Sequence, residues 1–280
     1  MTHDHPPSPA RGPISLPAET QDGLSDTVRS ACGAFGAYMR TIVGPAIDDL
    51  FRRIDNGSAR LHHVFAANFY LAHAIDYLLR IRSADAGSLQ PRGAFVKKFD
   101  ELFSVPGGRF QNCKFELIDA INNSLKHIEL DAHRYTALLE RYGAMSFRNL
   151  VEEEGLVLCL LSGYRFDYAR VVLRPAYRAL SGWDLDSSED ILEFARGDFA
   201  IDDWKAVDEL MASDDPSDAI DQMIAHCNPS CDDCGQQEEA CRCAEFVYEG
   251  EGGSFHSRFR ADFDFDLVMS RISGAYRPGD

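Results

Sequence analysis

Five cysteines lie close together near the end of the chain, within residues 227–243. They are Cys227, Cys231, Cys234, Cys241 and Cys243, with the spacing Cys-x3-Cys-x2-Cys-x6-Cys-x-Cys. A Cys-x2-Cys pair can place two thiolates on one ion, and two more thiolates complete the tetrahedral set that zinc prefers. Four thiolates leave no open coordination position, so the spacing predicts a structural zinc site. The spacing does not say which four of the five cysteines bind the ion. An iron–sulfur cluster and a metal-free, variably oxidised loop are the alternatives.

A second group of residues that can do chemistry is the stretch Asn-Asn-Ser-Leu-Lys-His, which begins at Asn122. Apolar side chains across 110–139 recur at alternating spacings of three and four, which predicts one long amphipathic helix. At about 100° per residue, Glu116, Asp119, Asn123, Lys126 and His127 fall opposite an apolar stripe that includes Leu125, with Asn122 at its border. This face is either a polar cleft in which His127 transfers a proton, or a solvated helix surface.

A helical bundle that carries Asn-Asn-x-x-Lys-His resembles the HEPN superfamily, over about residues 24–142. In its ribonuclease members an arginine, usually followed by a polar residue, precedes a histidine by five positions. On that resemblance Asn122 takes the arginine position, Asn123 the polar position and His127 the histidine position, and Lys126 supplies a cation nearby. The resemblance implies metal-independent RNA cleavage, in which the histidine moves a proton for attack by the ribose 2′-hydroxyl. It also implies a homodimer whose two motifs share a cleft.

The remaining pattern of the first half predicts helices that are joined by short loops. We expect helices over 24–53, 59–83 and 93–103, ahead of the long helix. The first of these should break at Gly44-Pro45, because proline removes a helical hydrogen bond and clashes with the preceding turn. This order of elements predicts an N-terminal antiparallel helical bundle over 24–145.

After residue 145 the pattern becomes that of a smaller, acidic α+β half, over 146–280, which carries the cysteine loop. Residues 154–161 predict a buried strand, and 164–173 predict either its hairpin partner or the start of a helix. Further elements are short helices over 187–195, 202–212 and 216–225, a half-buried strand over 255–265 and a final helix over 267–272. The expected fold class is therefore mainly α, with a helical bundle and a smaller α+β half that bears a metal-knuckle loop.

The net charge of −17 is unevenly distributed along the chain. Residues 24–150 carry 16 Lys+Arg against 13 Asp+Glu, whereas residues 151–280 carry 11 against 29. The first segment is compatible with RNA, while the second would repel nucleic acid and suits a basic protein partner. Residues 1–23 are proline-rich without apolar periodicity, which predicts a disordered tail. No apolar run approaches the ~20 residues that cross a bilayer, so we expect a cytoplasmic protein without membrane contact.

Two functions are compatible with these patterns. The first is a HEPN-like protein that acts on or with RNA in stress or phage defence, as a metal-independent endoribonuclease. Its catalytic residues would be Asn122, Asn123, Lys126 and His127. The alternative is a non-enzymatic, dimerising interaction or regulatory protein with a structural zinc knuckle, whose acidic half binds a basic partner. Asn122 favours the alternative because an asparagine brings no charge to an anionic transition state, whereas the adjacent Lys126 and His127 favour the enzyme.

Overall fold

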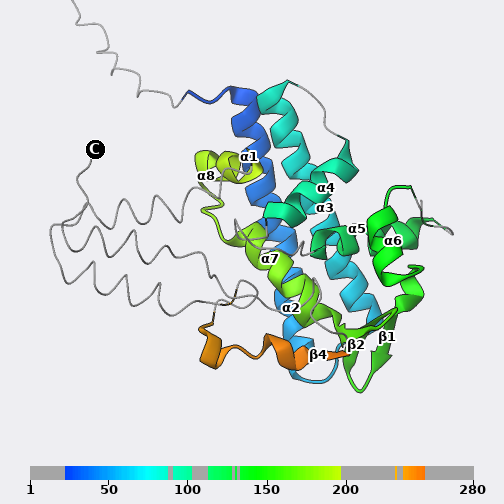
Figure 1. The fold of residues 1–280 in the computed structure, drawn as a ribbon. Coiled ribbons are helices and arrows are strands. Elements are labelled where there is room, and N and C mark those ends of the chain that lie inside the picture. Colours follow the sequence, from blue (N-terminus) through cyan, green and yellow to red (C-terminus); the bar gives the residue numbers. More distant parts are fainter. Residues whose placement is uncertain are drawn as a thin grey trace, which may run out of the picture.

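The computed structural model is mainly helical and has one small four-stranded antiparallel sheet at an end of the helical core (Figure 1). The mainly helical fold class is therefore confirmed. None of the helices in the described part of the chain is long and apolar enough to cross a membrane. The predicted tail, except Gly23, and the elements predicted at 202–225 and 255–272 lie outside the described residues. Those residues are 23–87, 91–102, 113–127, 130, 133–196, 231 and 236–249.

The first helical stretch continues through Pro45 and does not break there. It comprises α1 (Asp26–Tyr38), the π-helical turn η1 (Met39–Val43) and α2 (Gly44–Asp55). The predicted break is wrong for two reasons. Pro45 lies in the first turn of α2, where the missing N–H costs little, and the wider π turn before it leaves room for the proline ring.

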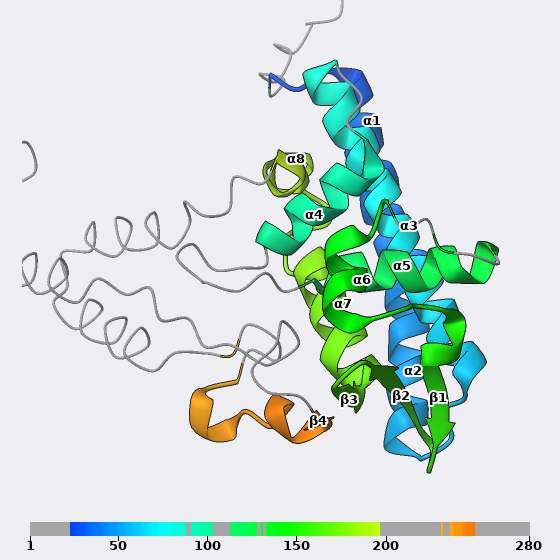
Figure 2. The same ribbon diagram turned by 45° about the vertical axis from the view of Figure 1, so that its right-hand side comes forward.

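Helix α3 (Leu61–Ala86) is the central element, and α1 packs along it (Figure 1). It ends at Gly87, whose positive φ of 64° favours glycine. The shorter α4 (Arg92–Leu102) and α5 (Lys114–Lys126) follow, and Figure 2 shows α5 running across α3 and not along it. The helices predicted at 59–83 and 93–103 are thus confirmed, with small shifts at their ends.

The long helix predicted over 110–139 is wrong, because the chain forms two helices there. Helix α5 ends at Lys126, and His127 has an extended backbone with φ −122° and ψ 139°. A second helix, α6 (Thr136–Tyr142), begins only after a turn.

The predicted polar face of α5 is wrong at two of its positions, although Lys126 and His127 are exposed as predicted. Asp119 and Glu116 were expected at the surface but are 1% and 6% exposed, whereas Leu125 was expected in the core and is 42% exposed. Helix α5 contacts α3, α4 and a later helical turn, so it is covered on more than one side. A single apolar stripe does not describe a helix that is buried all round.

The sheet consists of β1 (Leu150–Glu153), β2 (Leu156–Leu161), β3 (Tyr164–Asp167) and β4 (Val247–Glu249), in that spatial order. Strand β2 confirms the predicted buried strand. Both alternatives for 164–173 are realised in succession, because β3 is followed by the π-helical turn η3 (Ala169–Leu173). The β1–β2 turn needs glycine at Gly155, whose φ is +79° and where a Cβ would lie 2.7 Å from the carbonyl oxygen of Gly57.

Two further helices return the chain to the bundle. They are α7 (Arg174–Ser181) and α8 (Ser188–Arg196), and α8 packs on α1 and α3 and confirms the acidic helix predicted at 187–195. The guanidinium of Arg196 binds the Asp85 carboxylate with two hydrogen bonds of 2.7 and 2.8 Å. Described residues on both sides of position 145 share one hydrophobic core, and the division of the chain there into two domains stays a prediction.

Candidate metal centre and polar cluster

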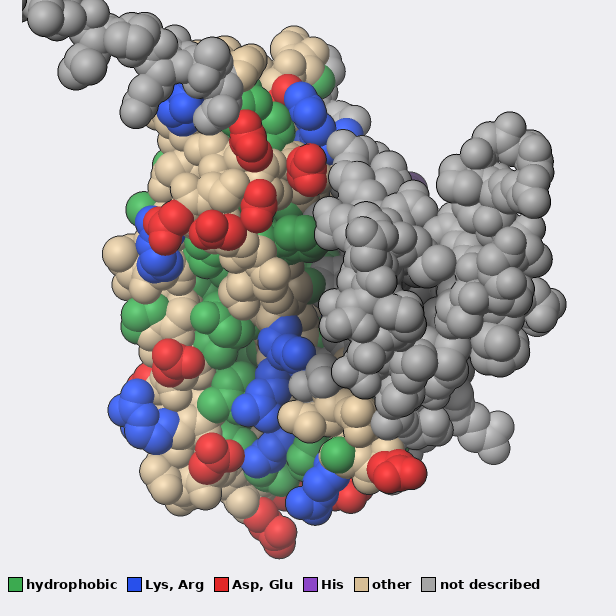
Figure 3. Space-filling model, turned by 90° about the vertical axis from the view of Figure 1, so that its left-hand side faces the viewer, with side chains coloured by type: hydrophobic (Ala, Val, Ile, Leu, Met, Phe, Trp, Pro, Cys, Tyr) green, Lys and Arg blue, Asp and Glu red, His purple; other side chains and the backbone are tan. Residues whose placement is uncertain are grey.

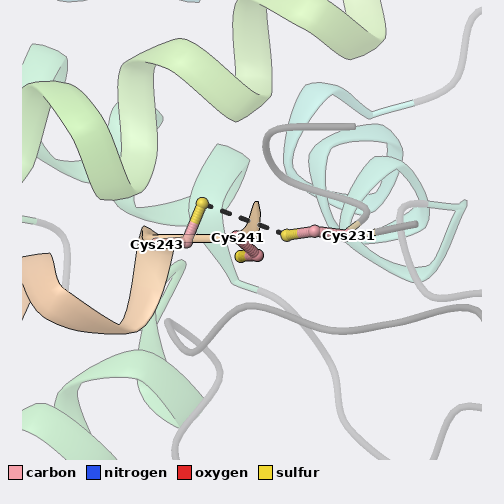
Figure 4. Close-up of side chains that lie close together, drawn as sticks. All are labelled: Cys231, Cys241 and Cys243. Atoms are coloured by element: carbon pink, nitrogen blue, oxygen red, sulfur yellow. Dashed lines mark hydrogen bonds between the residues drawn. The ribbon is translucent and has the colours of Figure 1, made fainter. Parts of the chain in front are cut away.

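Three of the five clustered cysteines converge in space. The Sγ atoms of Cys231, Cys241 and Cys243 all lie within 4.8 Å of one another, and those of Cys231 and Cys243 are 3.9 Å apart (Figure 4). The backbone N–H of Cys231 donates to the carbonyl oxygen of Gln236 at 2.7 Å. Cys243 begins the short helix η6 (Cys243–Phe246). Cys227 and Cys234 lie outside the described residues.

The sulfur arrangement fits a tetrahedral thiolate site. Two sulfurs that bind one zinc ion at about 2.3 Å lie about 3.8 Å apart in tetrahedral geometry, close to the 3.9 Å between Cys231 and Cys243. Cys231 is only 1% exposed, so an ion bound to its sulfur would be shielded from water. Arg242, which lies between the last two cysteines, directs its guanidinium to Glu245 at 2.8 Å. The three thiols can therefore hold a metal ion.

The cysteine loop is attached to the helical core through two contacts. Strand β4 follows η6 directly and pairs with β3, with Phe166 opposite Val247. The Arg170 guanidinium lies 4.8 Å from the Phe246 ring centroid and donates to the Asp167 carboxylate at 2.6 Å. Since Asp167 is 1% exposed at the end of β3, this arginine connects the loop to a buried charge.

The four polar residues predicted on α5 do not form one site. Asn122 is 3% exposed and belongs to the interior, whereas Lys126 and His127 are exposed at the end of the helix. The amide of Asn123 donates to the Asp119 carbonyl at 3.0 Å and to the hydroxyl of Tyr135. Asn122 is therefore separated from the exposed end of α5, where Lys126 and His127 lie.

A buried carboxylate organises a polar cluster around α5 that the sequence did not indicate. Asp119 accepts hydrogen bonds from the guanidinium of Arg92 on α4, from Arg134 at 2.6 Å and from the Tyr135 hydroxyl at 2.6 Å. Arg92 also donates to the carboxylate of Asp76 on α3 at 2.6 Å and to the carbonyl oxygen of Ala72. Three helices and the turn before α6 are joined in this way. His73 and Lys126 lie beside this network. The polar cluster is defined as His73, Asp76, Arg92, Asp119, Asn123, Lys126, Arg134 and Tyr135.

His73 occupies the outer edge of the polar cluster. Its Nδ1 lies 3.2 Å from the Asp76 carboxylate, and its ring centroid is 4.3 Å from that of Phe69. Burial lowers the pKa of His73, as do the charges of Lys126 and Arg92, while Asp76 opposes them. The spacing of His73 and Asp76 on one helix face is a local signal that could have identified the pair.

Comparison of the chain with known protein families, with curated proteins and with solved structures finds no match. The class of the protein therefore follows from its fold and from these two sites. It is a mainly helical protein with three converging cysteines, which could hold a metal ion, near the edge of a small sheet.

Proposed function

We propose that the chain is a non-enzymatic interaction protein in which a structural zinc ion fixes the C-terminal segment to the helical core. The observation that carries the proposal is the convergence of the Cys231, Cys241 and Cys243 sulfurs within 4.8 Å. Cys234 completes the set in this proposal, because its Cys-x2-Cys spacing from Cys231 lets both thiolates reach one ion. Four thiolates close the coordination sphere, so the ion stabilises structure and does not activate a water.

In this proposal the metal would hold the short edge strand β4 in place. Strand β4 is three residues long and pairs only with β3 among the described strands. So short an edge strand is marginal without further support. A zinc ion that joins residue 231 to residues 241 and 243 would restrain η6 and thereby hold β4 against the sheet.

Charge indicates the class of partner. Residues 197–280 carry 6 Lys+Arg against 20 Asp+Glu, a net of −14, whereas the described residues 151–196 carry 5 against 9. Most of the acidic charge thus belongs to the part of the chain that the metal would anchor. The helical face in Figure 3 is mixed, with a run of Lys and Arg side chains in its lower half and an acidic band above. We infer that the acidic C-terminal part binds a basic protein surface.

The zinc proposal is tested by metal analysis of the natively purified full-length protein. We expect about one zinc ion per chain, which Cys231→Ser and Cys243→Ser should both lose, because each removes a thiolate ligand. Cys113→Ser is the matched control, since this cysteine lies at the start of α5, outside the cluster. A protein that is fully folded without metal would overturn the proposal.

A ribonuclease is the second candidate function, and one observation favours it. Lys126 and His127 are both exposed and adjacent in sequence, so a cation and a proton-transfer group lie at the same end of α5. The test incubates the zinc-containing protein with labelled RNA in a magnesium-free buffer and looks for 2′,3′-cyclic phosphate ends. Cleavage that is abolished by His127→Ala but retained in His133→Ala, another exposed histidine, would establish the enzyme. Absence of cleavage by the wild type would remove this candidate.

A further inference from the structure

The polar cluster is a small positive region in an acidic protein. Lys126, Arg92 and Arg134 place three cations beside the carboxylates of Asp76 and Asp119, which leaves a net charge of +1 before His73 gains a proton. Both arginines bind carboxylates, whereas the Lys126 ammonium lies within 4.0 Å of no carboxylate of the residues that the structure describes. Lys126 is therefore the one cation of the cluster whose charge is not directly paired.

One nitrogen of His73 is also without a partner. Nδ1 faces the Asp76 carboxylate, while Nε2 is buried and has no hydrogen-bond partner in the described structure. A buried polar atom of this kind costs free energy and is rare in native proteins, so it calls for an explanation. Nε2 cannot be directed to Asp76 at the same time, so it remains for a further group.

The surroundings of His73 suit an anion. The groups that act on its charge are Asp76 on α3, Arg92 on α4 and Lys126 on α5, and two of these three are cations. The Phe69 ring lies against the imidazole, and the Lys126 Nζ is 5.8 Å from the centroid of the same ring. An apolar wall beside a cation reduces competition from water and strengthens electrostatic attraction. Phe69 is 40% exposed, Lys126 is exposed and the His73 side chain is 36% exposed, so an anion can approach the imidazole from solvent.

We propose that His73 and Lys126 form a binding site for a dianionic oxyanion, of the class of sulfate or a phosphate monoester. Lys126 supplies a fixed positive charge, and His73 takes up one proton from solvent and donates a hydrogen bond to the anion from Nε2. Asp76 keeps the ring in place through Nδ1 and favours its protonated form. The site goes beyond the proposed function, since neither the cysteine loop nor a basic partner is involved.

The proton uptake predicts the pH dependence of binding. Without the anion, burial and the charges of Lys126 and Arg92 lower the pKa of His73, so the imidazole is neutral at neutral pH. A bound dianion offsets the two cations and raises that pKa. Binding should therefore tighten as the pH falls, until His73 is already protonated in the free protein.

The test is calorimetric titration of the zinc-containing full-length protein with sodium sulfate, at constant ionic strength and several pH values. Sulfate does not titrate in this range, so any pH dependence belongs to the protein. We expect saturable binding that is linked to the uptake of about one proton. Lys126→Gln should weaken it about tenfold or more, and His73→Gln should leave weaker binding without pH dependence.

The controls make the result decisive. Arg52→Gln removes the same unit of charge from α2 and should leave sulfate affinity unchanged. Circular dichroism and thermal unfolding verify that each variant is folded, and Lys126 is exposed, so its replacement should be tolerated. Absence of saturable binding, or equal affinity of Lys126→Gln and the wild type, would overturn the site. Parallel titration with phenyl phosphate at one pH distinguishes an aromatic phosphate monoester from a free oxyanion by its tighter binding.

Discussion

The two sites of this protein are built in opposite ways. The three converging cysteines all lie within residues 231–243, so they are close along the chain as well as in space. The polar cluster draws on three helices and a turn between residues 73 and 135, and its centre is a carboxylate that is 1% exposed. We expect loss of the first site to release a segment, and loss of the second to weaken the whole helical core.

The largest effect is expected from Asp119→Ala. The substitution leaves Arg92 and Arg134 without their shared carboxylate, and removal of one partner from a buried charge network costs about 3–5 kcal/mol. Urea unfolding of the purified variant should show this loss in the free energy of unfolding. Asp48→Ala, at an exposed position of α2, should change it by less than about 0.5 kcal/mol. Equal stability of both variants would show that the polar cluster does not hold the helices together.

Removal of the metal should have a smaller and more local effect. In Cys231→Ser we expect faster hydrogen exchange of the β4 backbone amides, because the proposed ion would no longer restrain η6 beside that strand. Amides of α3 should keep their protection, since the core around this helix is formed by α1, α4, α5 and α8. Loss of protection in α3 as well would contradict the separation of the two sites.

The same contrast explains what the sequence could predict. The cysteine cluster, strand β2 and helices α3 and α8 have local signals, namely cysteine spacing, a short apolar run and helical periodicity with a capping residue. The buried centre of the polar cluster, Asp119, has no such signal. Asp119 looks like a surface residue in the α5 pattern, and only the approach of Arg92 and Arg134 from other elements permits its burial.

The end of α5 shows the same limit of local patterns. Apolar periodicity continues past Lys126, yet the backbone of His127 is extended and the helix stops. The motif that suggested a catalytic surface is thereby divided, because Asn122 is buried by tertiary packing that the spacing of residues does not encode. A periodic pattern indicates which face could be apolar, and the neighbouring elements decide which faces are covered.

The smallest expected effect is a difference between the two sites in how their stability depends on pH. Burial lowers the pKa of His73 in the folded chain below that in the unfolded chain, so the folded state binds fewer protons between the two values. The free energy of unfolding therefore decreases as the pH falls from about 6.5 towards the pKa of His73 in the folded chain. Zinc binding is also weakened by acid, because the thiolates must lose protons to bind the ion.

Urea unfolding of two variants between pH 5 and 8 separates these contributions. His73→Gln should unfold with a shallower pH dependence than the wild type, because glutamine does not titrate. Cys231→Ser should unfold with the pH dependence that His73 contributes, and hydrogen exchange of β4 measured in parallel should be faster than in the wild type. An unchanged pH profile in His73→Gln would mean that this imidazole has the same pKa in the folded and unfolded chains, and that the polar cluster does not desolvate it.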